Sequence, residues 1–149
     1  MSAKIKITTI AHDSDAYWQA LLMRDGLLRA PLGLEYSEED IAKEASDVHV
    51  VALERGEIVG TLLLRSAGEG LVQMRQVAVV RKRQGQGVGK DLVRFAEALV
   101  WAECGDEIFL HSREPVIGFY EALGYERVGD RFLEVGISHL KMRKRLGMG

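Results

Sequence analysis

With 149 residues, 47% of them hydrophobic and 28% charged, the chain is long enough to bury one globular core without disulfide or metal support, so we expect a single domain over 1–149. A formal net charge of −2 gives no overall basic field for nucleic acid or an anionic membrane, and the single cysteine, Cys104, excludes an internal disulfide. The longest apolar run, 58–64, is too short to cross a bilayer, and the first residues do not resemble a secretion signal. We therefore expect a cytoplasmic protein with small, local partners, no membrane and no nucleic acid.

The first third of the chain predicts a strand followed by two helices. Apolar and polar residues alternate over 5–10, as in a short strand. Asp13 or Ser14 can cap a following helix that ends before Pro31, and the capping sequence at the start of 37–45 predicts a second, shorter helix. The apolar side chains expected to share one face of the first helix are Trp18, Leu21, Leu22 and Leu28.

The middle of the chain predicts three strands in an antiparallel meander. Two apolar segments, 48–53 and 58–64, are joined by the hairpin-like sequence 54–57. A second glycine turn at 68–70 leads into a third strand at 71–79.

The remaining third predicts helices and strands in alternation. Apolar residues recur at helical spacing from Val88 to a stop at Gly105. The segments that follow are a short strand at 108–110, a helix at 116–123, and two strands within 125–142 that turn near 129–130 or 136.

Three glycines at alternate positions, Gly85, Gly87 and Gly89, stand where the third strand gives way to the long helix. The amide N–H groups at the start of a helix are unpaired and lie at the positive end of its dipole, so such a junction can hold a phosphate group. Glycine lets the anion approach the backbone closely. Four cationic side chains surround the glycines: Arg81, Lys82, Arg83 and Lys90.

The spacing of the glycines excludes two common phosphate motifs. A P-loop requires GxxxxGK followed by Ser or Thr, but Gln84 stands five residues before Gly89, and Asp91 follows Lys90. A dinucleotide fingerprint requires GxGxxG near the start of a βαβ unit, whereas this chain has GxGxG after an antiparallel meander. A nucleoside triphosphatase and a hydride-transfer enzyme are therefore disfavoured.

The segment 84–89, Gln-Gly-Gln-Gly-Val-Gly, resembles the RxxGxG or QxxGxG pyrophosphate loop of the GNAT superfamily of N-acetyltransferases. The preceding 74–79 is similar to the central strand of that family, and 119–125 is similar to its FYxxLGF segment. The resemblance implies the GNAT fold. This is an α/β (α+β) domain with a mixed, mostly antiparallel sheet of about six to seven strands, splayed at its centre and flanked by about four helices.

The same resemblance implies acetyl-CoA as co-substrate and no metal. In GNAT folds the pantetheine arm pairs with the splayed central strand like an added strand, and the diphosphate lies over the glycine loop. Arg113 stands where many members carry an asparagine that contacts the cofactor or positions a water, which puts that asparagine role in doubt and places a cation there. The residues expected to bind the cofactor are Val77, Ala78, Val79, Gln84, Gly85, Gln86, Gly87, Val88, Gly89, Lys90, Arg113 and Tyr120.

Acyl transfer to an amine requires stabilisation of an oxyanion and a proton for the departing thiolate. Tyr120, at the tyrosine position of the FYxxLGF segment, is expected to protonate the coenzyme sulfur. A strand N–H, that of Val77 or a neighbour, is expected to hold the carbonyl oxygen. Cys104 has no arrangement of partners that would make it a nucleophile, so direct transfer is favoured over an acyl-cysteine intermediate.

The acceptor amine also needs a base or a water relay, because an alkyl amine is mostly protonated at pH 7. The tail 132–142 resembles the FxExGIxHxxM ending of a bacterial GNAT subgroup, which points to Glu134 and His139 as acceptor-site residues. His111, after the short strand, is the second choice. A histidine base predicts an ionisation at about pH 6 to 7 in the rate profile.

Three hypotheses of function follow. The first is transfer of an acetyl group from acetyl-CoA to a primary amine of a small molecule, and the second is acetylation of a protein lysine or N-terminus. The third is an acyl-CoA-binding sensor without catalysis. Tyr120 and the three acid/base candidates favour catalysis, and a homodimer that pairs through the strands of 136–146 is also possible.

Overall fold

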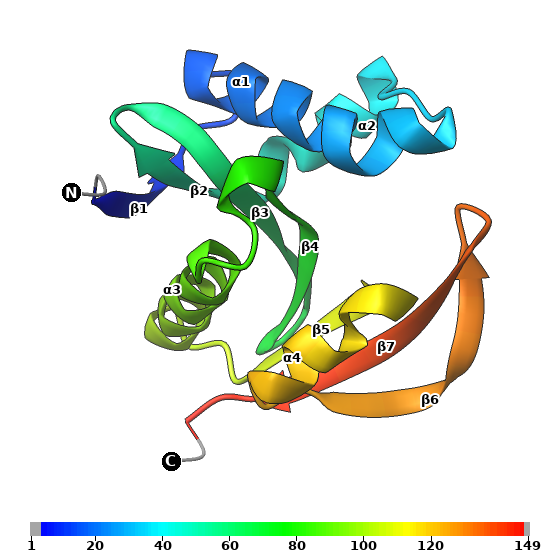
Figure 1. Cartoon of the computed structure of the whole chain (residues 1–149). Coiled ribbons are helices and arrows are strands. Elements are labelled where there is room, and N and C mark those ends of the chain that lie inside the picture. The colour runs from blue at the N-terminus through cyan, green and yellow to red at the C-terminus, as the bar shows by residue number, and fades with distance from the viewer. Residues whose placement is uncertain (1–3, 148–149) are drawn as a thin grey trace. The chain divides into compact units, whose positions relative to one another are not determined.

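A computed structural model describes residues 4–147, and these form seven strands and four α-helices (Figure 1). The strands are β1 (Ile5–Ile10), β2 (Val48–Glu54), β3 (Glu57–Gly68), β4 (Leu71–Val79), β5 (Glu107–Arg113), β6 (Glu126–Glu134) and β7 (Ile137–Arg145). They follow the order β1-β2-β3-β4-β5-β7-β6 in the sheet. The helices are α1 (Asp15–Arg24), α2 (Glu38–Lys43), α3 (Val88–Ala102) and α4 (Ile117–Ala122). The predicted mixed α/β fold is confirmed.

The chain divides into two compact units, which are described separately. The first comprises residues up to 65 together with 76–96, and the second comprises 66–75 and residues from 97 onward. The long strands and the long helix each contribute residues to both units.

In the first unit, β1 and β3 pair with β2 in antiparallel register. The sequence predicted the pairing of β2 with β3 and made no prediction about the partner of β1. The β2–β3 hairpin closes through Arg55 and Gly56, which both have positive φ angles, 53° and 79°. Two successive left-handed residues form the tight turn that matches the natural twist of paired strands. The hairpin interpretation of 54–57 is therefore confirmed.

Both faces of the β2–β3 hairpin are buried, which explains its continuous apolar sequence. On one face, the ring of His49 lies 5.1 Å from the ring of Tyr17 in α1. On the other face, a Cβ at Gly60 would lie 2.8 Å from Leu92 Cδ1 of α3. Gly60 therefore lets α3 pack directly against the strand.

The buried face of α1 differs from the predicted one. Ser14 caps the helix as expected, accepting a hydrogen bond from the N–H of Tyr17. Leu21 is buried as predicted, but Trp18 is 39% exposed and Leu22 is 73% exposed, so the predicted face is wrong at these two positions. The buried side chains, spaced at helical intervals, are Tyr17, Ala20, Leu21 and Arg24. A pattern of apolar residues cannot include a buried arginine, so the predicted buried face of the helix was rotated by one position.

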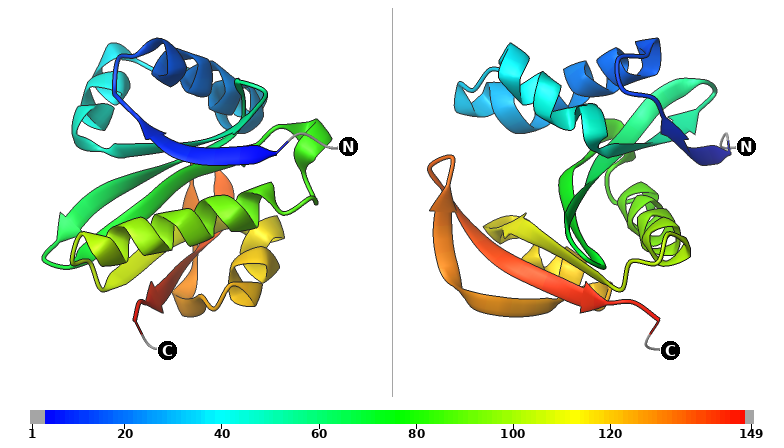
Figure 2. Two further views of the ribbon diagram at one scale, coloured as in Figure 1. Left: turned by 90° about the vertical axis from the view of Figure 1, so that its left-hand side faces the viewer. Right: turned by 180° about the vertical axis from the view of Figure 1, so that it is seen from behind.

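In the second unit, β7 pairs on one side with β5 and on the other with β6, antiparallel in both cases. The β6–β7 hairpin is the orange and red pair of strands in Figure 2. It turns at Val135 and Gly136, while Gly129 lies where the register of β6 shifts. Of the two turn positions predicted, Gly136 is therefore correct. Because β7 already pairs with a strand on each side, it cannot form the strand pairing across a dimer that was suggested for 136–146.

The end of α3 is anchored in the second unit by a buried carboxylate. Glu97 accepts a hydrogen bond from the hydroxyl of Tyr125 at 2.9 Å and from Lys144 Nζ at 3.1 Å. Lys144 also donates to the carbonyl of Leu123 at 2.8 Å. These contacts join α3, the end of α4 and β7. Within residues 4–147, no helix has the length and apolar character needed to cross a membrane.

Candidate functional site

The glycine loop lies in the first unit and leads into α3. Gly85 and Gly87 have φ angles of 77° and 89°, which L-residues with side chains rarely adopt. The first i→i−4 bond of α3 runs from the N–H of Asp91 to the carbonyl of Gly87, at 2.9 Å. The N–H groups of 88–90 precede that bond and so point out of the helix end. The backbone geometry on which the predicted phosphate site depends is therefore present, while phosphate binding itself stays a prediction.

Side chains of the loop fix its backbone. Gln84 Nε2 donates to the carbonyl of Val79 at 2.9 Å, and Gln86 Nε2 donates to the carbonyl of Lys82 at 3.1 Å. Arg83 is bound to Glu54, with Nη2 and Oε1 at 2.6 Å, and this interaction lowers the pKa of Glu54. Arg83 therefore contributes to the structure of the loop. The other cationic side chains, Arg81, Lys82 and Lys90, are exposed beside the glycines.

In the second unit, three of the predicted site residues come together, with two imidazoles in contact with one carboxylate. His111 Nδ1 lies 3.0 Å from Glu134 Oε1, and His139 Nε2 lies 3.6 Å from Glu134 Oε2. His111 belongs to β5, whereas Glu134 and His139 belong to the two strands of the β6–β7 hairpin. The ring of Phe132 packs near both imidazoles, with its centroid 5.0 Å from that of His111 and 5.9 Å from that of His139.

The hydrogen bonds of this cluster determine where the imidazole protons lie. His139 Nδ1 is 2.9 Å from the carbonyl of Ile137, and a carbonyl can only accept, so Nδ1 carries a proton. In the neutral ring, Nε2 is then a free base that faces Glu134. The Glu134 carboxylate, like the Ile137 carbonyl, accepts a hydrogen bond, in this case from Nδ1 of His111. His139 is buried, whereas the side chain of Glu134 is 46% exposed and can reach a ligand from solvent.

Tyr120 and Arg113, the other candidates in this unit, belong to α4 and to the end of β5. Tyr120 is 6% exposed and packs edge-on against Phe119, with ring centroids 5.0 Å apart. Burial raises the pKa of the Tyr120 hydroxyl, because the charged phenolate is disfavoured away from water. Arg113 stands opposite His139 in the β5–β7 register, which brings its backbone to the same edge as the histidine cluster.

The predicted pantetheine strand, 77–79, begins directly after an irregular residue of β4. Gln76 has a φ angle of 52°. Its side-chain Oε1 accepts a hydrogen bond from the hydroxyl of Tyr36 at 3.1 Å. Sequence patterns gave no sign of this interaction, because Tyr36 belongs to no motif and lies 40 positions from Gln76.

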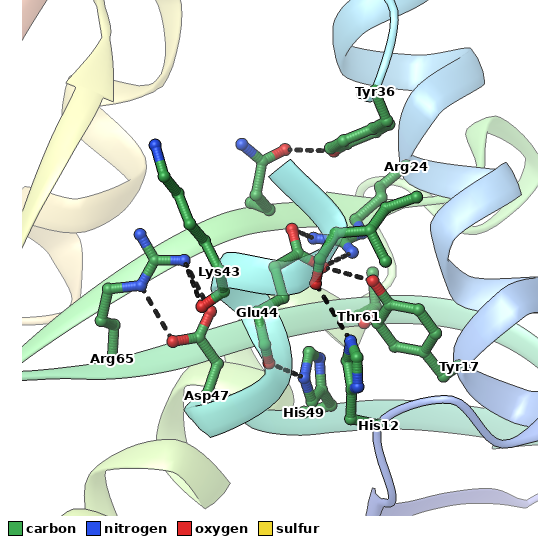
Figure 3. A network of polar contacts seen from close by, with 12 residues as sticks. His12, Tyr17, Arg24, Tyr36, Lys43, Glu44, Asp47, His49, Thr61 and Arg65 are labelled. Atoms are coloured by element: carbon green, nitrogen blue, oxygen red, sulfur yellow. Dashed lines mark hydrogen bonds and ion pairs between the residues drawn. The ribbon is translucent and has the colours of Figure 1, made fainter. Parts of the chain in front are cut away.

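A buried polar network in the first unit was also missed from the sequence (Figure 3). Glu44 accepts a hydrogen bond from the Tyr17 hydroxyl at 2.8 Å. It also accepts hydrogen bonds from Arg24 Nη1, at 2.9 Å, and from Arg24 Nη2. His49 Nε2 donates to the carbonyl of Glu44 at 2.9 Å. Burial and the neighbouring carboxylate raise the pKa of Tyr17. The network joins α1, the turn after α2, and β2.

The buried His49 predicts a specific loss of stability in mild acid. Burial lowers the pKa of His49 below its ordinary value of about 6.5, so between that value and the folded one only the unfolded chain binds the proton. The contribution of neutral His49 to the free energy of unfolding is complete above about pH 6.5. It declines as the pH falls, by up to about 1.4 kcal/mol per pH unit. Urea unfolding at pH 7.5, 6.5 and 5.5 should show this decline in the wild type and a smaller one in His49→Gln. An identical decline in both proteins would contradict the assignment.

No group of three or more His, Cys, Asp or Glu side chains suited to a metal ion occurs within residues 4–147.

The protein resembles known proteins over most of its length. It is 27% identical over 112 residues to the uncharacterized protein YyaT of Bacillus subtilis, an alignment that covers 75% of this chain and 74% of that protein. It is 28% identical over 95 residues to the uncharacterized N-acetyltransferase CT2212 of Chlorobaculum tepidum, covering 64% of this chain and 59% of that protein.

A solved structure shares the fold, and a family model identifies the family. An aminoglycoside 6'-N-acetyltransferase complexed with coenzyme A superposes with a TM-score of 0.80 at 19% identity, covering 94% of this chain and 96% of that one. The family model described as "Acetyltransferase (GNAT) domain" matches residues 32–146. The mixed α/β fold is the one expected from this family. The chain therefore belongs to the GNAT acetyltransferase family and is an acyltransferase.

Proposed function

We propose that this acyltransferase moves an acetyl group from acetyl-CoA directly to a primary amine of a small molecule. The observation that carries the proposal is the contact of both His111 and His139 with the carboxylate of Glu134. A carboxylate attracts an ammonium group, and a neutral imidazole beside it can accept a proton from that group. The cluster thus combines the two properties that an amine acceptor requires.

The residues of the glycine loop fit the diphosphate of coenzyme A. A Cβ built on Gly85 or Gly87 would meet no atom of the described chain within 4 Å, so the backbone there is open to a ligand. The N–H groups at the start of α3 and the ammonium of Lys90 offer hydrogen bonds and positive charge to an anion. When bound, acetyl-CoA would supply the activated thioester.

Glu134 and His139 would then act on the acceptor. Glu134 Oε2 would bind the ammonium form of the amine, and Nε2 of neutral His139 would take one of its protons, leaving a neutral, nucleophilic amine. His111 would hold the carboxylate in place by donating from Nδ1. The hydrogen bond from His139 Nδ1 to Ile137 fixes the ring so that Nε2 faces the carboxylate.

Tyr120 would serve as the acid. Because burial raises its pKa, its hydroxyl keeps its proton at neutral pH and can donate but not abstract. The separate roles of Tyr120 and His139 follow from their surroundings, since one is a buried phenol and the other an imidazole beside a carboxylate.

An acceptor screen with detection of thiol release tests the proposal. The aminoglycoside named for the structural relative suggests amino sugars as first candidates, together with polyamines, amino acids and, for the protein-acetylation alternative, peptides. We expect release with at least one small amine. Release with peptides alone would replace the proposal with protein acetylation. Binding of coenzyme A without release to any amine would support a non-catalytic sensor.

The same assay tests the role of Glu134. Glu134→Gln removes the charge that would attract the ammonium, so the KM for the amine should rise about tenfold while the KM for acetyl-CoA changes less than about twofold. Glu121→Gln is the matched control, because Glu121 is also an exposed, paired glutamate of the same unit but contacts Arg127. Equal effects of the two substitutions on the amine KM would exclude Glu134 from the acceptor site.

A further inference from the structure

The most unusual backbone geometry in β4 is at Gln76. Five residues other than glycine have positive φ angles within residues 4–147. Asp13, Arg55, Cys104 and Val135 lie in turns or at the end of a helix, whereas Gln76, with φ 52°, lies inside a strand. A left-handed conformation is unfavourable for a residue with a side chain, so surrounding contacts must hold it.

Tyr36 provides such a contact. Its hydroxyl donates to Gln76 Oε1 at 3.1 Å, across 40 positions of sequence. The ring of Tyr36 itself contacts two cations, with the guanidinium of Arg29 4.3 Å and that of Arg24 5.2 Å from its centroid. Figure 3 shows Tyr36 and Arg24. Burial raises the pKa of Tyr36, so the hydroxyl remains protonated and able to donate.

The backbone that follows Gln76 is fixed again three residues later. The N–H of Val80 donates to the carbonyl of Val59 at 2.9 Å, and the carbonyl of Val79 accepts from the Gln84 side chain at 2.9 Å. The peptide groups of 77–79 thus lie between a left-handed residue and an anchored strand end. A left-handed residue within a strand turns the peptide groups that follow it away from the regular ladder.

We infer that Tyr36 is a positioning residue for the cofactor. By hydrogen-bonding to Gln76, it holds β4 in the conformation that directs the backbone N–H groups of 77–79 at the pantetheine arm of acetyl-CoA. This inference rests on the proposed function, because it assumes that those amides bind acetyl-CoA. It assigns a role to a residue of the segment before α2, which would act through Gln76.

Calorimetry with two ligands tests the inference. Tyr36→Phe keeps the ring and its cation contacts and removes only the hydroxyl, so the affinity for acetyl-CoA should fall about threefold to tenfold. The affinity for 3'-phosphoadenosine diphosphate, which lacks the pantetheine arm and would contact only the glycine loop, should be unchanged. A general loss of structure would instead lower the affinity for both ligands, and thermal unfolding of each variant would reveal such a loss.

Replacement of Gln76 by glycine supplies the rescue. Glycine adopts positive φ without support, so Gln76→Gly should bind acetyl-CoA within about twofold of the wild type, and the double variant with Tyr36→Phe should bind as Gln76→Gly does. The inference is overturned if the wild type binds acetyl-CoA and Tyr36→Phe binds it equally well, or if the hydroxyl still matters in the glycine background. Absence of acetyl-CoA binding by the wild type would instead refute the proposed function.

Discussion

Tyr120→Phe is expected to lower kcat by about a hundredfold or more and to leave the dissociation constant of acetyl-CoA within about twofold. The substitution removes one oxygen atom and keeps the aromatic packing against Phe119 and Tyr125, whose ring centroids lie 5.0 Å and 5.8 Å away. The loss should therefore fall on proton donation, which matters in the chemical step, and not on binding. Steady-state kinetics at saturating acetyl-CoA and amine would measure it.

The neighbouring tyrosine offers a matched control. Tyr125 is also buried, and its hydroxyl donates to Glu97 at 2.9 Å. Tyr125→Phe should lower stability while kcat stays within about threefold of the wild type, because a hydroxyl engaged by Glu97 is not the proposed acid. If Tyr120→Phe retains full turnover at saturating substrates, or if both variants lose turnover equally, Tyr120 is not the proton donor.

Glu44→Gln is expected to reduce the free energy of unfolding by about 3–5 kcal/mol. The guanidinium of Arg24 is 1% exposed and pairs with Glu44, so the substitution leaves a buried positive charge without a counter-charge. The loss far exceeds that of a surface ion pair, because water cannot solvate the stranded cation. Urea unfolding at pH 7.5 would measure the effect.

Two further variants separate this cause from ordinary packing loss. Combining Glu44→Gln with Arg24→Met removes the stranded cation, so the double variant should recover most of the lost stability. Arg127→Gln breaks an exposed pair with Glu121 and should give no measurable change. A double variant as unstable as Glu44→Gln alone would show that the buried charge is not the reason for the loss.

The sequence predicted the order of the elements because each carries a local signal. Alternation marked β1, the glycine turns marked the meander, and helical spacing marked α3, all of which are confirmed. The face of α1 was wrong because Arg24 occupies a buried position that an apolar pattern cannot recognise. Local patterns report periodicity, and they do not report which charged residue finds a buried partner.

The candidate site was predicted in part. A family motif indicated Glu134 and His139, and the place of His111 after a short strand suggested that residue. No pattern could tell that both imidazoles contact one carboxylate, since this depends on the β5–β7–β6 strand order. The hydrogen bond from Tyr36 to Gln76 was missed for a similar reason. It joins residues far apart in sequence, and a left-handed residue inside a strand has no compositional sign unless it is glycine. The roles of these residues remain predictions.

The missing side chain at Gly60 lets the start of α3 lie close against β3. A Cβ there would stand 3.2 Å from Val88 Cγ1 and 2.8 Å from Leu92 Cδ1, so even a methyl group would require these two side chains to shift. Both belong to the first turns of α3, so the packing of the helix start on the strand depends on this glycine. In the proposed function the amides of that helix start hold the diphosphate, and a strand residue outside the binding site would then influence where it lies. A glycine loop transferred alone into another protein would therefore lack the strand residue against which its helix packs.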